Sequence, residues 1–172
     1  HVSTGKTTLI ENILLTGGKI TRAETIESGK TVSDYTEEEI EKKISIHSSL
    51  SHMEWNNKKL NFVDTPGSSD FIGEVIAGFR SCETALILAG CDTGVQIETL
   101  KLWRNLEERN KPRIVFINKC DKERADFTGA MQDLKDKFQK TFVPISIPIG
   151  TGAAYKGIIN LLEDKAYLIP DI

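Results

Sequence analysis

The sequence predicts an α/β fold in which helices flank a mostly parallel, twisted sheet. Short apolar runs alternate along the chain with amphipathic stretches, a rhythm typical of strand–helix–strand units. Three apolar runs end directly at a turn, as buried strands do; they cover residues 60–63, 85–89 and 114–117. At 172 residues, 39% of them hydrophobic, the chain is long enough to bury one sizeable core.

Helical patterns lie between the predicted strands, at residues 71–79, 96–107 and 130–138, and another apolar helix begins near Leu9. Residues 45–55 alternate in polarity, which favours an antiparallel edge strand. Residues 21–41 are polar and predict a long surface loop, a kind of segment that is usually functional. Its acidic run at 37–41 fits a solvated loop face better than a metal cluster. Residues 158–169 fit either a short helix or paired strands.

Composition narrows the function classes. The formal net charge of −3 gives no basic footprint, so we expect no DNA partner and only local contacts to any RNA. No apolar run approaches the roughly 20 residues that cross a bilayer, so we expect no membrane partner. The three cysteines form no C-x-x-C pair and the three histidines have no zinc-ligand spacing, which favours reduced thiols in a cytoplasmic protein.

The first eight residues, HVSTGKTT, match the end of the phosphate-binding pattern G-x-x-x-x-G-K-[ST], whose first glycine would precede His1. Gly5 lets the backbone approach a phosphate, Lys6 places its charge on the β- and γ-phosphates, and Thr7 offers a hydroxyl to Mg²⁺. Thr8 follows in the first turn of the helix, and helix geometry together with the phosphate-binding pattern implies that it can reach the α-phosphate. A chance match in a loop is the alternative, but the apolar helix that follows is the context that the motif requires.

A second motif, Asp64-Thr65-Pro66-Gly67, follows the strand at 60–63. An aspartate at the end of a strand can hold a water of a Mg²⁺ shell, and the Gly67 N–H can sense a γ-phosphate. Taken alone, D-x-x-G is also a common turn.

A third motif, Asn118-Lys119-Cys120-Asp121, follows the strand at 114–117. Asp121 can accept hydrogen bonds from guanine N1–H and its amino group, while Asn118 and Lys119 brace the base; adenine offers no matching pair of donors. A polar turn that closes a strand is the alternative for this motif alone. Three motifs in this order, each beside a predicted element, identify a P-loop GTPase that binds GTP and GDP with Mg²⁺.

The sequence resembles the G domain of elongation factor G, in particular the paralogous second class of that family. The resemblance runs from residue 1 to about residue 166 and is carried by residues 1–8, 34–36, 64–67, 70–74, 94–96, 112–113 and 118–122. It implies a translation factor that, as an intact protein, works with ribosomal RNA and ribosomal proteins. It also implies that residues 21–46 form switch I, with Ser45 in the place of the threonine that senses Mg²⁺ and the γ-phosphate.

Departures from the family pattern bear on catalysis. The family follows D-T-P-G with a histidine that orients the attacking water, and Ser68 stands there instead. The resemblance therefore assigns the catalytic positions to Lys6, Gly67 and Ser68, and we expect slow hydrolysis with nucleotide binding retained. Lys42-Lys43 also replaces Arg-Gly in switch I, and Ser3 stands where the family often has an aspartate.

The family pattern further suggests that the chain is incomplete. We expect residues 1–149 to form a G-domain core that lacks its first strand, and residues 150–172 to begin an insertion within the domain. Small GTPases have a last base-binding element at about the distance that separates Ser146 from Asp121. Pro148 fits poorly beside a guanine-contacting turn, because proline lacks a backbone N–H. We therefore expect that element beyond Ile172.

Two other functions stay open beside a working translational GTPase. One is a nucleotide-dependent ribosome-binding module with vestigial hydrolysis, which Ser68 favours. The other is a regulatory GTPase outside translation, which would show no affinity for ribosomes.

Overall fold

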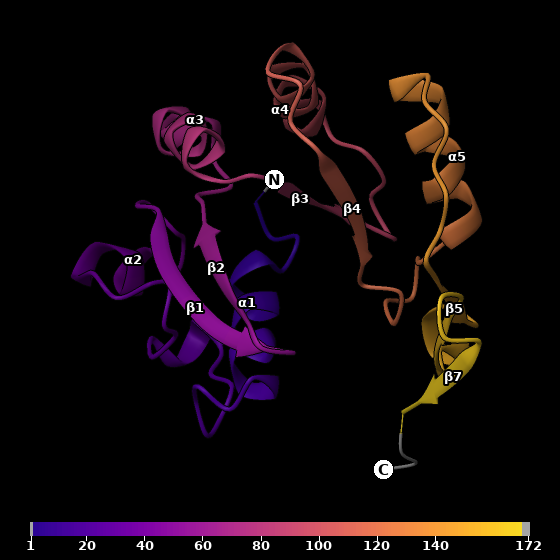
Figure 1. Cartoon of the computed structure of the whole chain (residues 1–172), viewed down its shortest axis with the longest axis horizontal. Helices are drawn as coiled ribbons and strands as arrows, with labels where there is room; N and C mark the ends of the chain where they lie inside the picture. Colours follow the sequence, from indigo (N-terminus) through magenta and orange to yellow (C-terminus); the bar gives the residue numbers. More distant parts are fainter. Residues whose placement is uncertain (1, 170–172) are drawn as a thin grey trace. The chain divides into compact units, whose positions relative to one another are not determined.

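The computed structural model describes residues 2–169 as two compact units (Figure 1). The first unit comprises His1–Ala85 with Asn110–Arg113, and the second comprises Leu86–Arg109 with Ile114–Ile172. Along the described residues, no helix has the length and apolarity that crossing a bilayer would require.

The first unit packs three helices with one antiparallel hairpin. Its helices are α1 (Lys6–Thr16), α2 (Glu37–Lys42) and α3 (Ile72–Ser81), and its strands are β1 (Ser49–Trp55) and β2 (Lys58–Asp64). Asn56 and Asn57 join the strands with φ values of 47° and 59°, the backbone that a tight hairpin turn requires and that asparagine tolerates. Leu14, Met53 and Val75 supply buried apolar side chains from α1, β1 and α3.

The second unit holds the remaining elements. They are β3 (Ala85–Gly90), α4 (Ile97–Glu108), β4 (Arg113–Asn118), α5 (Phe127–Phe138), β5 (Ser146–Ile149), β6 (Gly157–Asn160) and β7 (Lys165–Leu168), with the first residues of β3 and β4 at the boundary between the units. β3 pairs with β4, and β5, β6 and β7 form a separate antiparallel sheet.

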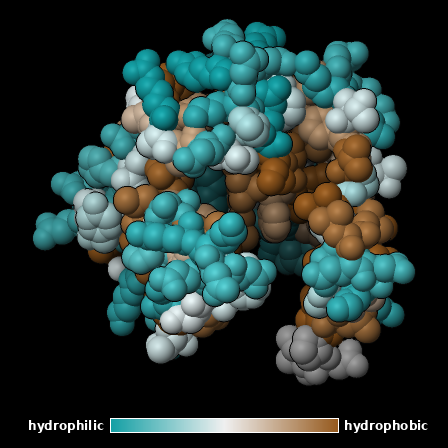
Figure 2. Space-filling view, viewed as in Figure 1, coloured by the Kyte–Doolittle hydropathy of each residue, from teal (hydrophilic) through white to brown (hydrophobic). Residues whose placement is uncertain are grey.

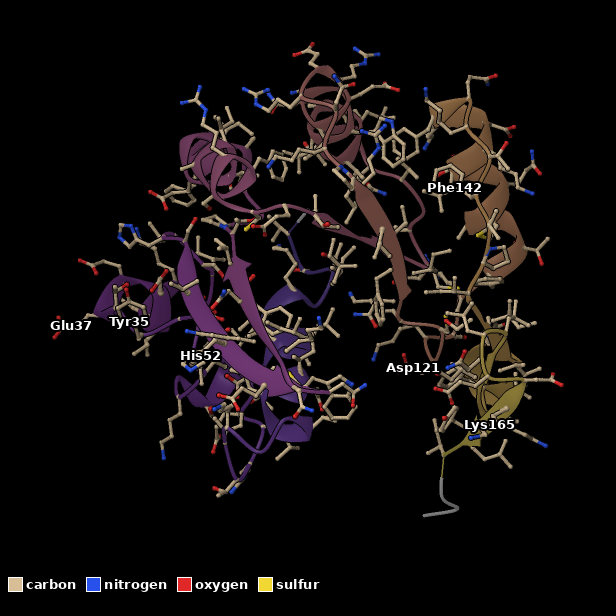
Figure 3. The ribbon with its side chains drawn as sticks, viewed as in Figure 1. Tyr35, Glu37, His52, Asp121, Phe142 and Lys165 are labelled. Atoms are coloured by element: carbon tan, nitrogen blue, oxygen red, sulfur yellow. The ribbon has the colours of Figure 1, made fainter. Side chains whose placement is uncertain are left out.

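An aromatic stack joins α4 to α5 in the second unit. The Trp103 ring lies 4.0 Å from that of Phe138 at an interplanar angle of 17°, and Phe142, labelled in Figure 3, packs against both rings. Leu106 and Leu134 are buried beside them. This cluster gives the unit a core although its strands are short.

Most of the elements expected from the sequence are confirmed. The strands at 60–63, 85–89 and 114–117 and the four helices are present, and the antiparallel strand at 45–55 begins only at Ser49. The predicted burial holds only for 85–89, where Ile87, Leu88 and Ala89 are buried; none of residues 60–63 or 114–117 is. Residues 158–169 are paired strands rather than a helix. The mostly parallel, twisted sheet and its missing first strand stay predictions. So does the boundary between residues 149 and 150, which falls between the paired strands β5 and β6.

The polar loop expected at 21–41 contains a helix that the sequence prediction missed. Thr36 accepts a hydrogen bond from the Glu39 N–H, and the Glu39 side chain accepts one from the Thr36 N–H. This reciprocal pair is a capping box, which starts α2 inside the loop. The sequence signal was present, since T-x-x-E is the pattern of such a cap.

Candidate functional site

The phosphate-binding motif lies at the start of α1. Gly5 precedes the helix with φ 89°, a left-handed backbone that suits glycine, and Lys6 is the first helical residue. The free N–H groups of such a helix start attract anions. Burial lowers the pKa of Lys6, while the carboxylates of Asp64 and Asp34 act in the opposite direction. Thr8 is exposed on the first turn of the helix.

The three residues predicted to hold Mg²⁺ meet in the first unit. The buried Thr7 hydroxyl donates a hydrogen bond of 2.9 Å to the Asp64 carboxylate at the end of β2. The same hydroxyl lies 3.5 Å from the Ser45 hydroxyl. Residues from three separate stretches of the sequence therefore place their oxygen atoms together at the start of α1.

Asp34 is a further acidic side chain at this site, and in the sequence it stands out only as part of the resemblance. It is 4% exposed, and neither of its carboxylate oxygens finds a hydrogen-bond partner among the described residues. Burial raises the pKa of Asp34, with the nearby Ser45 hydroxyl and Lys6 opposing and Asp64 reinforcing the rise. Burial likewise raises the pKa of Asp64, against the hydroxyls of Thr7 and Ser33 and the charge of Lys6. A buried carboxylate with so few hydrogen-bond donors is a candidate ligand for a cation.

This donor set fits Mg²⁺. Hydroxyl and carboxylate oxygens are the ligands that this cation prefers, and it usually keeps waters and substrate phosphate oxygens in its shell. Among residues 2–169 no group of three or more His, Cys, Asp or Glu side chains could hold a metal without such help. The few protein oxygens at Thr7, Ser45, Asp64 and Asp34 match a site that shares its cation with a phosphate.

Ser68 uses its hydroxyl locally. It accepts a hydrogen bond of 3.3 Å from the Asp70 N–H and donates one of 3.1 Å to the Asp70 carboxylate, which starts the short helical turn Ser69–Phe71. Gly67, next to it, is half-buried.

Buried glutamates organise the long polar segment of the first unit. Glu11 on α1 is 1% exposed and accepts hydrogen bonds from the N–H groups of Glu24 and Val32, at 2.9 and 2.6 Å. Glu39 is equally buried, so its prediction as part of a solvated acidic face is wrong. Glu37 and Glu38 do lie exposed, and Figure 3 shows Glu37 and Tyr35 at the outer side of α2. Glu39 is buried because it takes part in the helix cap, and the number of charges in the run does not reveal this difference from Glu37 and Glu38.

The base-recognition motif lies in the second unit, in the loop after β4. The Asn118 side-chain oxygen accepts the Lys119 N–H at 2.8 Å, and its backbone carbonyl accepts the Cys91 N–H at 2.7 Å. Lys119 has φ 64°, a left-handed backbone uncommon outside glycine. The Asp121 carboxylate, labelled in Figure 3, is exposed and lies 3.6 Å from the Lys122 ammonium.

Among the described residues, Ser146 makes no hydrogen bond to the loop after β4. It is the exposed first residue of β5 and pairs in register with Asn160. The turn after β5 does bond to the motif, since the Gly152 N–H donates to the Cys120 carbonyl at 2.8 Å.

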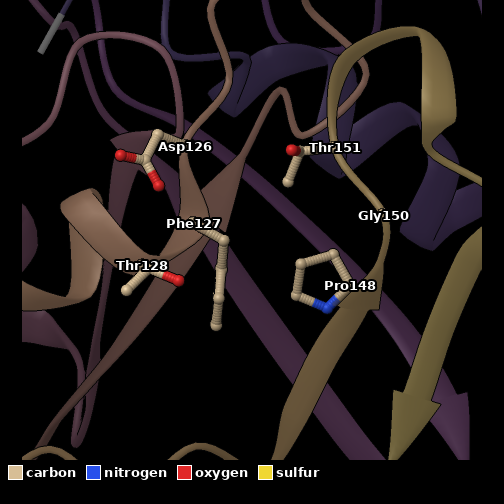
Figure 4. A pocket seen from close by; sticks show the side chains of 6 residues that line it. All are labelled: Asp126, Phe127, Thr128, Pro148, Gly150 and Thr151. Carbon is tan, nitrogen blue, oxygen red and sulfur yellow. The ribbon is translucent and has the colours of Figure 1, made fainter.

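A small pocket lies beside that turn (Figure 4). Its volume is 210 Å³, and its lining combines the start of α5 with the end of β5 and the following turn: Asp126, Phe127, Thr128, Pro148, Gly150 and Thr151. Typical ligand pockets begin near ~300 Å³. We therefore assign no ligand to it. Leu162 and Leu168 are exposed on the β6–β7 hairpin, and Figure 2 shows apolar surface at the lower right, where Figure 1 draws this hairpin.

Comparison with known proteins bears on these motifs. The family described as "Elongation factor Tu GTP binding domain" matches residues 1–170. The chain is 41% identical over 167 residues to an "Elongation factor G-like protein" of Thermotoga maritima. It is 37% identical over 167 residues to "Elongation factor G" of Mycoplasma pneumoniae and 36% identical over 171 residues to that of Salinibacter ruber. These matches cover 97–99% of this chain and 24% of each relative, so the chain spans about a quarter of their length.

The fold is also similar to a solved one. A crystal structure of a Thermus thermophilus protein matches with a TM-score of 0.93 and 29% sequence identity. The match covers 99% of this chain and 26% of that protein.

Proposed function

Since the chain belongs to the elongation factor Tu GTP-binding domain family, we propose that it is the GTP/GDP switch of an elongation factor G-like translation factor. The observation that carries the proposal is the meeting of Thr7, Ser45 and Asp64, three residues from separate motifs, within hydrogen-bonding reach. Such an arrangement suits a site whose geometry depends on whether a γ-phosphate is present.

The roles follow from the motifs. Gly5, Lys6, Thr7 and Thr8 hold the phosphates, and Asn118, Lys119 and Asp121 select guanine. Thr7, Ser45 and Asp64 hold Mg²⁺, which would neutralise developing charge on the phosphate oxygens when bound. The intact factor acts in the cytoplasm with the ribosome, and residues 1–149 form the G-domain core that precedes an insertion at 150–172.

We also propose that hydrolysis is slow. Ser68 stands where an imidazole would orient water, and its hydroxyl is bonded to Asp70 instead. This observation supports the second candidate function, a ribosome-binding module with vestigial hydrolysis.

Nucleotide binding tests the proposal. The protein that carries this chain is titrated with fluorescent GDP and GTP analogues in the presence of Mg²⁺. We expect tight binding that weakens at least about tenfold in Lys6→Ala and Asp121→Ala, since each loses a charge-assisted contact. Lys59→Ala, which changes an exposed lysine on β2, is the matched control. Absence of binding by the unaltered protein would refute the GTPase assignment.

Co-sedimentation with ribosomes then separates the alternatives. A translation factor pellets with ribosomes in the presence of a GTP analogue and less with GDP. A regulatory GTPase outside translation stays in the supernatant with both nucleotides.

A further inference from the structure

The backbone that follows Ser45 is held by carboxylates from two helices. The N–H groups of Ile46 and His47 both donate to one oxygen of Glu39 on α2, at 2.9 and 3.0 Å. The next N–H, that of Ser48, donates to Glu74 on α3 at 2.8 Å. Three successive backbone donors therefore end on two side chains from different parts of the sequence.

Glu39 also ties this backbone to the start of its own helix. Its second carboxylate oxygen accepts the N–H and the hydroxyl of Thr36 at 3.1 and 2.9 Å, and the Tyr35 N–H at 3.3 Å. Burial would raise the pKa of Glu39, but the N–H groups of His47, Ile46 and Thr36 together bring it below its usual value. These hydrogen bonds therefore favour the ionised form of Glu39 although it is almost fully buried.

Glu74 ties the same backbone to α3, which follows the Asp64–Gly67 motif. Its carboxylate accepts the Ser48 N–H, and its backbone carbonyl accepts the Ser48 hydroxyl at 3.3 Å. Hydrogen bonds from Ser48 hold the pKa of Glu74 below its usual value, and the nearby His47 contributes in the same direction.

Apolar packing does little to hold the segment. None of residues 40–50 is buried, so the hydrogen bonds to Glu39 and Glu74 are what fix its path. That path brings the Ser45 hydroxyl to 3.5 Å from the Thr7 hydroxyl. A loop fixed by a few polar contacts is easily released when one contact is lost.

We propose that Glu39 and Glu74 are positioning residues that hold Ser45 beside Thr7 and thereby set the preference of the protein for GTP over GDP. The inference rests on the proposed function, because it takes Ser45 as the residue that senses Mg²⁺ and the γ-phosphate. Neither glutamate contacts the nucleotide site itself; each acts through the backbone of residues 46–48.

Isosteric variants test this role in the intact protein. Glu39→Gln turns an amide NH₂ toward backbone donors that need an acceptor, because both oxygens of Glu39 accept hydrogen bonds. Glu74→Gln leaves an oxygen for the Ser48 N–H but replaces a charged acceptor with a neutral and weaker one. We expect the affinity for a non-hydrolysable GTP analogue with Mg²⁺ to fall about tenfold, with less than about a twofold change for GDP. Glu38→Gln, exposed on the same helix, and Glu54→Gln, exposed on β1, are the matched controls and should keep the preference of the unaltered protein.

Backbone hydrogen exchange provides a second test of the positioning role. The amides of residues 46–48 should exchange faster in either variant, while those of α1 keep their protection. Glu74 is only half-buried, so Glu74→Gln folds even if Glu39→Gln does not.

The outcomes separate this inference from the function beneath it. An unchanged preference for GTP, or an equal loss of both nucleotides, overturns the positioning role while GTP binding stands. A protein that binds neither nucleotide before any substitution overturns both.

Discussion

The hydroxyl of Thr7 and the carboxylate of Asp64, 57 residues apart in sequence, are joined by a hydrogen bond of 2.9 Å. The bond links the first turn of α1 to the end of β2. Both side chains are buried, so the hydrogen bond satisfies polar atoms that water does not reach.

Thr7→Ala should therefore destabilise the fold as well as weaken nucleotide binding. Asp64 loses a donor that partly offsets its burial, and we expect the free energy of unfolding to fall by about 1–3 kcal/mol. Urea unfolding measures this loss. Thr16→Ala, at the exposed end of the same helix, should change the value by less than about 0.5 kcal/mol. An equal effect of the two substitutions would contradict the importance of the Thr7–Asp64 bond.

Asp34→Asn should raise stability at neutral pH and lower the affinity for Mg²⁺ with nucleotide. Burial raises the folded-state pKa of Asp34, so the unfolded chain loses its proton first as pH rises. The folded state is therefore destabilised as pH rises from the unfolded-state pKa near 3.8 to the raised folded-state pKa. Above both pKa values, the wild-type protein bears the full free-energy cost of burying the Asp34 charge.

Asparagine removes that titration, with an expected gain on the order of 1 kcal/mol at pH 7 and none below pH 3.8. Unfolding measured across this pH range checks the sign, with the exposed Asp136→Asn as control. A loss of stability at pH 7 would show that Asp34 has a partner in solution.

Glu11→Gln should loosen the polar segment from α1. An amide can offer only one acceptor oxygen to the N–H groups of Glu24 and Val32, and its NH₂ would face the other donor. We expect about 1–3 kcal/mol of destabilisation in urea unfolding, whereas the exposed Glu108→Gln should be near neutral. If proteolysis between residues 24 and 32 does not become faster in Glu11→Gln, the anchoring role is refuted.

Ser68→His should accelerate GTP hydrolysis. A positioned acid–base group contributes about 10²–10⁴-fold, and an imidazole at this position would reach farther than a serine hydroxyl. Single-turnover hydrolysis with and without ribosomes measures the gain, and Ser69→His, one residue further along the same turn, controls for adding an imidazole nearby. Rates that match those of the unaltered protein would show that something other than the missing imidazole limits hydrolysis.

The strands and helices were predictable because short apolar runs that end at turns and amphipathic periods mark them along the chain. Residues 60–63 and 114–117 needed no other information. The conformation of the segment between α1 and β1 was not predictable in this way, because it depends on contacts such as Glu11 with Val32 and Glu39 with His47. Charge patterning treats Glu37, Glu38 and Glu39 alike, and only the capping box at Thr36 distinguishes the buried one.

Part of the candidate site was likewise predictable from the sequence, and part was not. Its motifs could be found by spacing, yet nothing in the sequence pattern of residues 31–36 indicates that Asp34 is buried without a partner near Lys6 and Asp64. Such a position follows from the path of the whole segment rather than from local preference.

The left-handed backbone of Lys119 lowers the stability of the fold at a residue whose side chain is proposed to contribute to guanine selectivity. Glycine would adopt φ 64° without strain, so Lys119→Gly should relieve a local cost of about 1 kcal/mol. It would also delete the long side chain proposed to pack on the base. The backbone at this position would accept glycine more readily, and lysine brings strain together with a side chain that can reach the base.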